Sequence, residues 1–242
     1  MRIRLTLFSL AFSVLGLSLL SACAGNITVT ADATVPTPIV DPHPFNVGVY
    51  YSTELVEYVH EQKVADRGSI TIDLGRNQKT VFDRTFGQMF QEVVHVDSLD
   101  AIPQNVAGVL VPSIIRVQLM TPRQSRNDYY EIWIEYGIDI ILPDGTKLDF
   151  ASTASRGGRE DPEARRTQVA WMIAAYGKAN KQDYSSFMDK ADSALAEATQ
   201  NAYRDAALLI VASLANIADP PRRGDPRIKS AVREWIKENS QP

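Results

Sequence analysis

The residue best suited to chemistry in this sequence is Cys23, the only cysteine among 242 residues. A thiolate is a strong nucleophile, and the chain offers no second cysteine for an internal disulfide. The residues ahead of it follow a set order: Arg2 and Arg4 supply positive charge, and an uncharged apolar run extends from Leu5 to Leu20. A basic segment, an apolar segment and then small residues are typical of a secretory signal peptide, so we predict that residues 1–22 are removed.

The four residues Leu20, Ser21, Ala22 and Cys23 resemble the lipobox of bacterial lipoproteins, which the lipoprotein signal peptidase recognises. The resemblance implies that Cys23 becomes the first mature residue and carries a thioether-linked diacylglycerol and an acylated amino group, with fatty acids such as palmitate. The next residue is Ala24 and not aspartate, which for this class of lipoprotein implies transfer to the outer membrane.

Two other interpretations of the leader remain open. Ser21 and Ala22 could form the small-residue cleavage site of an ordinary secretory leader, with Cys23 as a chance neighbour. The leader could also stay uncut as a membrane anchor, although its apolar run of about 16 residues is shorter than the ~20 that span a bilayer. Stable anchoring needs at least two lipid signals, and the acyl chains on one modified Cys23 would supply them.

Composition limits the classes of partner. Removing residues 1–22 takes away two arginines and leaves 23 basic against 29 acidic residues, a net charge of −6. This balance argues against nucleic acid and against reliance on an anionic lipid surface, because both favour a basic excess. With 45% hydrophobic residues the chain can bury a full core, and its length suggests one domain.

The segment after the lipobox predicts a tether. Residues 23–44 are rich in Thr, Ala and Pro and hold few large apolar side chains before Phe45. Such a stretch buries little surface and favours extended geometry of ~3 Å per residue, so we expect it to hold a folded domain up to ~60 Å from the membrane.

Residues 45–218 predict an α+β sandwich, mostly an antiparallel sheet covered by helices. Strands are expected at 45–51, 69–74, 93–96, 106–111 and 114–119, with a break, a bulge or an edge position at Pro112. The clearest signal is a hairpin: apolar residues alternate from Tyr130 to Leu142, the segment 143–145 has turn chemistry, and a return strand begins at Leu148. Glu131, Glu135 and Asp139 fall on the opposite, wet face.

Apolar spacing also predicts helices within this domain. They are expected at 53–62, 80–92, 167–176 and 184–218, the second with a core stripe of Phe82, Phe86, Met89, Phe90 and Val93. A further amphipathic helix is expected in a C-terminal extension, residues 219–242, where it packs on its own domain or touches a membrane or partner.

The sequence assembles no catalytic or metal-binding constellation. The three histidines, His43, His60 and His95, are scattered without a second ligand at metal-binding spacing, and nucleotide-binding and hydrolase motifs are missing. Asp139 and Asp149 could face each other across the hairpin as a carboxylate pair. We therefore expect no enzyme and no cofactor, with a periplasmic hydrolase that uses these carboxylates as the alternative.

The lipobox and the order of elements between Val47 and Ala218 resemble the ABC-transporter auxiliary lipoproteins and the lipopolysaccharide-assembly lipoproteins, whose domains are α/β sandwiches. The resemblance implies a non-catalytic outer-membrane lipoprotein that faces the periplasm as an accessory or assembly subunit of an envelope transport or biogenesis system. We expect it to bind a protein partner or a lipid, with an exposed sheet edge or the C-terminal helix as the contact surface.

Overall fold

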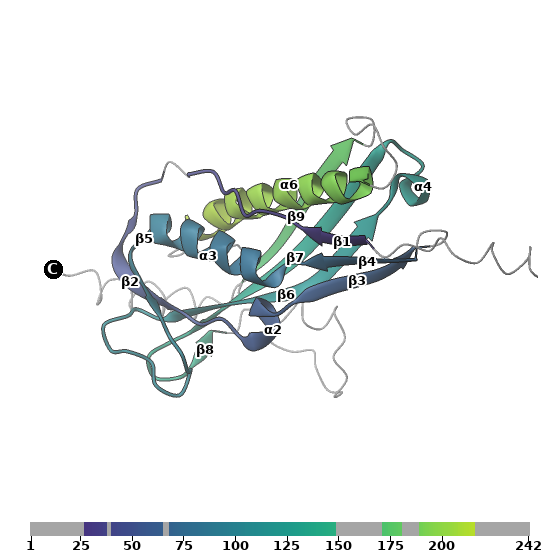
Figure 1. The fold of residues 1–242 in the computed structure, drawn as a ribbon. Coiled ribbons are helices and arrows are strands. Elements are labelled where there is room, and N and C mark those ends of the chain that lie inside the picture. The colour runs from purple at the N-terminus through teal and green to yellow at the C-terminus, as the bar shows by residue number, and fades with distance from the viewer. Residues whose placement is uncertain (1–26, 38–39, 65–67, 149–170, 181–188, 216–242) are drawn as a thin grey trace, which may run out of the picture.

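The computed structural model describes residues 27–37, 40–64, 68–148, 171–180 and 189–215. They form an α+β fold with a six-stranded and a three-stranded sheet, which confirms the predicted fold class (Figure 1). The strands are β1 (Ile27–Thr30), β2 (His43–Val49), β3 (Val59–Val64), β4 (Gly68–Asp73), β5 (Phe90–His95), β6 (Val109–Met120), β7 (Tyr129–Ile141), β8 (Lys147–Leu148) and β9 (Trp171–Asn180). The helices among these residues are α2 (Thr53–Val56), α3 (Gly75–Met89), α4 (Pro122–Ser125) and α6 (Asp189–Leu214).

The larger sheet has the order β5-β2-β6-β7-β8, with β9 paired to β7 on the same side as β8. Its pairs from β6 onward are antiparallel, as the alternating sequence predicts, but β2 runs parallel to both β5 and β6. The predicted hairpin is confirmed: β7 and β8 flank a turn in which Gly145 takes a φ of +82° and Asp144 accepts a hydrogen bond from the Thr146 amide at 2.8 Å. The part of the sheet formed by β6, β7 and β8 is therefore the part that sequence periodicity predicts best.

Strand β9 corrects the prediction of a helix at 167–176. The residues Trp171, Ile173, Ala175 and Ala179 alternate with exposed neighbours and are buried, and β9 pairs with β7 along its whole length. An apolar run rich in alanine can form either a buried helix or a strand. Here it forms a strand, because the edge of β7 offers backbone hydrogen-bonding groups with which β9 pairs. The predicted long helix that follows is confirmed as α6.

Helix α6 packs directly on β9. The backbones of the two elements approach so closely at Gly177 that a Cβ added there would overlap the Ala198 carbonyl and the Ala202 amide nitrogen. Alanines at positions 194, 198, 202 and 206 are fully buried and make this approach possible. The wet side of the sheet is therefore the face opposite α6 (Figure 1).

Helix α3 fills the other part of this layer and contacts α6. Phe82, Phe86 and Met89 lie on its buried face, as the aromatic stripe predicts, and the Phe82 ring meets the Tyr136 ring edge-on at 5.4 Å between centroids. The helix ends three residues earlier than predicted, because Phe90 begins β5. Phe90 is nevertheless buried in the same core.

The smaller sheet, in the order β1-β4-β3, contains two corrections. The predicted helix at 53–62 stops at Val56, and β3 pairs antiparallel with β4. Strand β1 lies inside the predicted tether and pairs parallel with β4, from Ile27 opposite Ile70. The tether prediction is therefore wrong for this segment.

The segment that follows β1 is also held on the domain. Val29 and Ala31 are buried in the main core, the Asn77 side chain donates a hydrogen bond to the Ala31 carbonyl, and Arg84 donates one to the Ala33 carbonyl at 3.1 Å. Alternation of small apolar and polar residues is enough for a strand when a sheet edge, here β4, is available beside it.

Gln62 on β3 joins the two sheets. Its side-chain nitrogen donates to the Leu119 carbonyl at 2.9 Å, and its oxygen accepts from the Leu119 amide at 3.3 Å. The side-chain amide of Gln62 therefore hydrogen-bonds to both backbone groups of Leu119 on the unpaired edge of β6, as the backbone of a neighbouring strand would. His60, two residues before it on the same face of β3, is half-buried.

We predict a pH effect on stability at His60. Burial lowers the pKa of its imidazole below the ordinary 6.5, and a hydrogen bond with Gln62 opposes this only partly. The unfolded chain then binds this proton more tightly than the folded chain, so the free energy of unfolding should fall as the pH drops from about 7.5 through 6.5 toward the folded pKa. In urea titrations between pH 7.5 and pH 5.5, His60→Gln should lose less stability than the unaltered protein. Equal losses would contradict this assignment.

Candidate functional site

The predicted site residues Leu20, Ser21, Ala22 and Cys23 lie outside the described residues. The described chain begins four residues after Cys23, at Ile27 in β1. The predicted C-terminal helix also lies outside the described residues. The sites that the structure does describe are therefore on the folded domain.

The predicted carboxylate pair on the hairpin is not assembled among these residues. Asp139 Oδ2 forms an ion pair with Lys147 Nζ at 2.9 Å, and Asp149 lies outside the described part of the chain. The lysine neutralises the carboxylate, so Asp139 is engaged in holding the hairpin together.

The outer edge of β9 is closed to strand addition. Asp205 on α6 accepts a hydrogen bond from the Tyr176 amide at 2.8 Å, and Asn201 donates one to the Lys178 carbonyl at 2.9 Å. Both side chains occupy positions that an added strand would use. This edge therefore does not serve as the exposed sheet edge that the sequence led us to expect.

The wet face of the larger sheet carries an aromatic patch, which we define as Tyr129 and Trp133 on β7 with Met172 and Tyr176 on β9. Trp133 lies opposite Tyr176 in the β7–β9 register, and their ring centroids are 5.0 Å apart. Met172 lies opposite Gly137, which has no side chain to cover it, and is 49% exposed. The strand alternation that buries the isoleucines of β7 places Trp133 on this open side.

Charged side chains surround the aromatic patch. Lys178 Nζ lies over the Tyr129 ring, 4.7 Å from its centroid, and Arg116 pairs with Glu135 at 2.9 Å. Burial, followed by the nearby Glu131 carboxylate, raises the pKa of the Tyr176 phenol, which therefore keeps its proton near neutral pH. The face combines an aromatic centre with a rim of paired charges.

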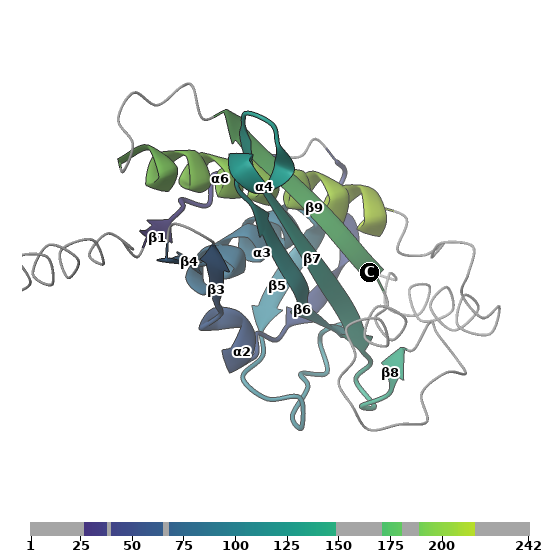
Figure 2. The same ribbon diagram turned by 90° about the vertical axis from the view of Figure 1, so that its right-hand side faces the viewer.

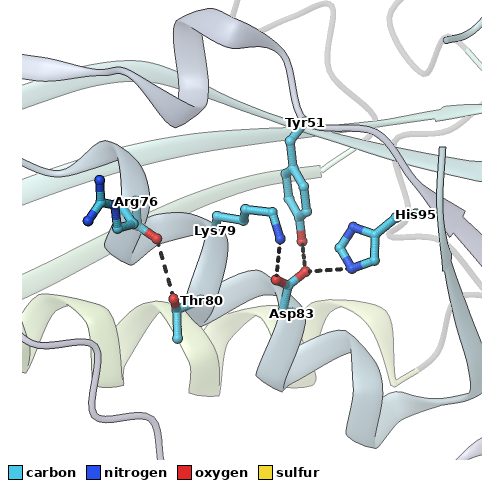
Figure 3. A network of polar contacts seen from close by, with 6 residues as sticks. All are labelled: Tyr51, Arg76, Lys79, Thr80, Asp83 and His95. Atoms are coloured by element: carbon cyan, nitrogen blue, oxygen red, sulfur yellow. Dashed lines mark hydrogen bonds and ion pairs between the residues drawn. The ribbon is translucent and has the colours of Figure 1, made fainter. Parts of the chain in front are cut away.

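A second polar arrangement surrounds Asp83 on α3, at the carboxyl ends of the parallel strands β2 and β5 (Figure 3). Its carboxylate accepts a hydrogen bond from the Tyr51 hydroxyl at 2.7 Å, pairs with Lys79 Nζ at 2.7 Å and lies 3.4 Å from His95 Nε2. Burial, and then the bond to Asp83, raise the pKa of the Tyr51 phenol well above its usual range, so it remains a donor.

This arrangement can orient His95 and hold a proton near Asp83, but a hydrolase also needs a nucleophile beside the histidine. Within the described part of the chain, neither a hydroxyl nor a thiol group hydrogen-bonds to His95. The network joins the ends of β2 and β5 to the helix between them. We therefore interpret it as structural.

We predict that Asp83→Asn lowers the free energy of unfolding by about 1–2 kcal/mol, because Tyr51 and Lys79 lose a charged acceptor. Lys79→Gln is the matched control. It leaves the Tyr51–Asp83 hydrogen bond in place. It removes a partly exposed pair between residues four apart on the helix, worth about 0.3–0.5 kcal/mol, together with the contact of Lys79 Nζ with the Tyr51 ring, 5.0 Å from its centroid. Urea titrations that gave equal losses for both variants would contradict a central role for Asp83.

Gln78 on α3 is fully buried, and neither polar atom of its side chain hydrogen-bonds to a residue that the structure describes. An unpaired buried amide costs about 1–3 kcal/mol. We therefore expect Gln78→Met, which keeps the shape, to raise the free energy of unfolding by about 1–2 kcal/mol in urea titrations. A loss of stability would show that the amide finds partners in solution.

The described residues contain no group of three or more His, Cys, Asp or Glu side chains that could hold a metal ion. Among their helices, none is both long and apolar enough to cross a membrane.

Comparisons with known proteins place few limits on function. No family model matches the sequence, and a search of the curated proteins finds no match. Among solved structures, the chain is similar to protein XCC0632 from Xanthomonas campestris, which is assigned to the family model DUF330. The two are 7% identical with a TM-score of 0.42, over 78% of this chain and 98% of that chain. Likeness at this level transfers no function.

Proposed function

We propose that the chain is a non-catalytic lipoprotein of the outer membrane, anchored through acyl groups on Cys23 and facing the periplasm. In this proposal it is an accessory or assembly subunit of an envelope transport or biogenesis system, and it binds a protein partner. The lipobox at residues 20–23 and the Ala24 that follows it support the proposed location in the outer membrane. The lack of a catalytic motif in the sequence supports a binding role.

The aromatic patch on the wet face of the sheet carries the binding part of the proposal. A monomeric domain gains little by placing the paired rings of Trp133 and Tyr176, and farther along the same face the 49% exposed Met172, on the side of the sheet opposite α6. Aromatic residues, Met and Arg are the residues enriched at protein–protein interfaces, where a polar rim surrounds them. The patch and its rim of Lys178 and the Arg116–Glu135 pair have this composition.

A protein partner fits this face better than a lipid tail does. The strands β6, β7 and β9 present an open surface, and the charged groups of Lys178 and Glu135 lie among the aromatic rings and at their edges. Lipid tails need apolar walls without such charges, whereas a protein can satisfy both the rings and the charged rim. Figure 2 shows β6, β7 and β9 side by side in the larger sheet.

Site-specific photocrosslinking in the native envelope tests the proposal. A photoreactive benzophenone side chain replaces Met172 on the wet face or, as the matched control, Leu208 on α6. The two positions are 49% and 55% exposed and lie on opposite sides of the domain. A discrete crosslinked protein is expected from position 172 and none from 208. Equal crosslinking from both positions, or none from 172, would refute the proposed binding face.

A further inference from the structure

We infer that the domain rests directly on the phospholipid headgroups, with one defined end against the membrane. This inference depends on the proposed acylation of Cys23. The membrane-proximal end, as we define it, consists of the start of β1, the ends of β3 and β4 that face each other at Val64 and Gly68, and helix α4.

The first step of the argument is the short length of chain between the anchor and the fold. Ile27 is the fourth residue after Cys23, and it is already paired with Ile70 and 7% exposed. Four residues extend at most about 14 Å even when fully stretched. An acylated Cys23 lies at the level of the headgroups, so Ile27 cannot lie farther than about 14 Å from that level.

The second step is that the sheet register fixes which part of the domain accompanies Ile27. Ile27 lies opposite Ile70, Ile70 lies opposite Gln62, and the Gln62 amide binds the Leu119 backbone. These residues therefore form one row across both sheets, with neighbouring strands about 4.8 Å apart. Helix α4 begins three residues after Leu119, at Pro122.

The two views of the ribbon agree with this row. The start of β1, the end of β3 and α4 lie at one end of the domain (Figures 1 and 2). The β7–β8 turn lies at the other end. Strand β7 has 13 residues and so separates the two ends by roughly 40 Å.

The surface of the membrane-proximal end suits headgroups rather than lipid tails. Lys63 and Arg126 are exposed there, as are Arg123 and Asp128. Guanidinium and ammonium groups bind phosphate oxygens well, and the polar surroundings keep the end from entering the hydrocarbon layer. The occupant that we assign to this surface is the phosphate layer of the bilayer that holds the anchor.

Quenching of single labels by headgroup nitroxides tests the orientation. The thioether at Cys23 blocks the native thiol, so Arg123→Cys at the membrane-proximal end and Thr146→Cys at the far end can each take one fluorophore. The full-length lipidated proteins are reconstituted in phosphatidylethanolamine–phosphatidylglycerol vesicles that contain a lipid with a nitroxide on its headgroup. We expect at least threefold stronger quenching at position 123 than at 146. Equal quenching, or stronger quenching at 146, would overturn the orientation.

Two controls separate this inference from the proposed function. If the protein floats with the vesicles and its mass shows an acylated Cys23, the anchor is in place. The comparison of quenching at positions 123 and 146 then tests only the orientation of the domain. If Cys23 is not acylated and the protein does not float, the proposed function fails first. Inserting a flexible Gly-Ser segment of about 20 residues after Gly25 allows roughly 25 Å of separation and should abolish the difference between the labels. An unchanged difference would contradict the short chain as its cause.

Discussion

Gly177→Ala should strongly destabilise the fold. Its Cβ would overlap backbone atoms of Ala198 and Ala202, which cannot rotate away as a side-chain tip can. Helix α6 would have to move off β9, and the hydrogen bond from the Tyr176 amide to Asp205 would break. We expect a loss of about 3 kcal/mol or more in the free energy of unfolding, measured by urea titration.

Gly87→Ala is the matched control, because an added Cβ there meets nothing within 4 Å in the last turn of α3. Alanine has the higher helix propensity, so this variant should gain about 0.5–1 kcal/mol. A Gly177→Ala protein as stable as the Gly87→Ala protein would show that α6 does not pack on β9 as closely as described.

Cys23→Ser should remove the protein from the outer membrane. Serine cannot form the thioether, and the lipobox resemblance implies that the signal peptidase cuts only ahead of a lipid-modified cysteine. We therefore expect the variant to keep residues 1–22 and to be missing from the outer-membrane fraction in membrane fractionation and immunoblotting. Under the proposal, two or three acyl chains anchor the native protein stably, so the expected change is from nearly all to nearly none.

Ala24→Asp is the control for that experiment. It leaves the cysteine intact, so the protein should still be cut and acylated, but the aspartate should hold it at the inner membrane. A Cys23→Ser protein that reached the outer membrane in its normal amount would contradict lipid anchoring.

The parts of the fold that could be predicted are those with long, unambiguous periodicity. Strand β7 alternates over its whole length, and α6 repeats small apolar residues at three- and four-residue steps. Strands β3 and β9 were predicted as helices because apolar residues in short segments satisfy both periods. Their structure depends on partners distant in sequence, namely the open edges of β4 and β7, which local periodicity does not contain.

The tether prediction failed for a related reason. Residues Ile27 to Ala31 alternate apolar and polar side chains over a short span only, and the Thr-, Ala- and Pro-rich composition of residues 23–44 as a whole suggests a segment that does not fold. The parallel edge of β4 and the side chains of Asn77 and Arg84 hold them on the domain. Under the proposed acylation of Cys23, this pairing brings the domain against the membrane, whereas the tether prediction allowed a separation of up to ~60 Å.

The aromatic patch could be predicted only in part. The alternation of β7 places Glu131 and Glu135 on the wet side, and Trp133 belongs to the same set, so a tryptophan among wet-face positions was the signal for the patch. Its partner Tyr176 could not be found, because pairing it with Trp133 requires the β7–β9 register and the strand structure of β9. The Asp83 network likewise depends on the parallel β2–β5 pair, which brings Tyr51 and His95 together.

The measurement that tests the central claim most directly is the intact mass of the native protein extracted from its membranes. The account predicts a chain that begins at Cys23 and is heavier than residues 23–242 by a diacylglyceryl group and an amide-linked acyl group. A chain with a free thiol at Cys23, or one that still carries residues 1–22, would contradict it.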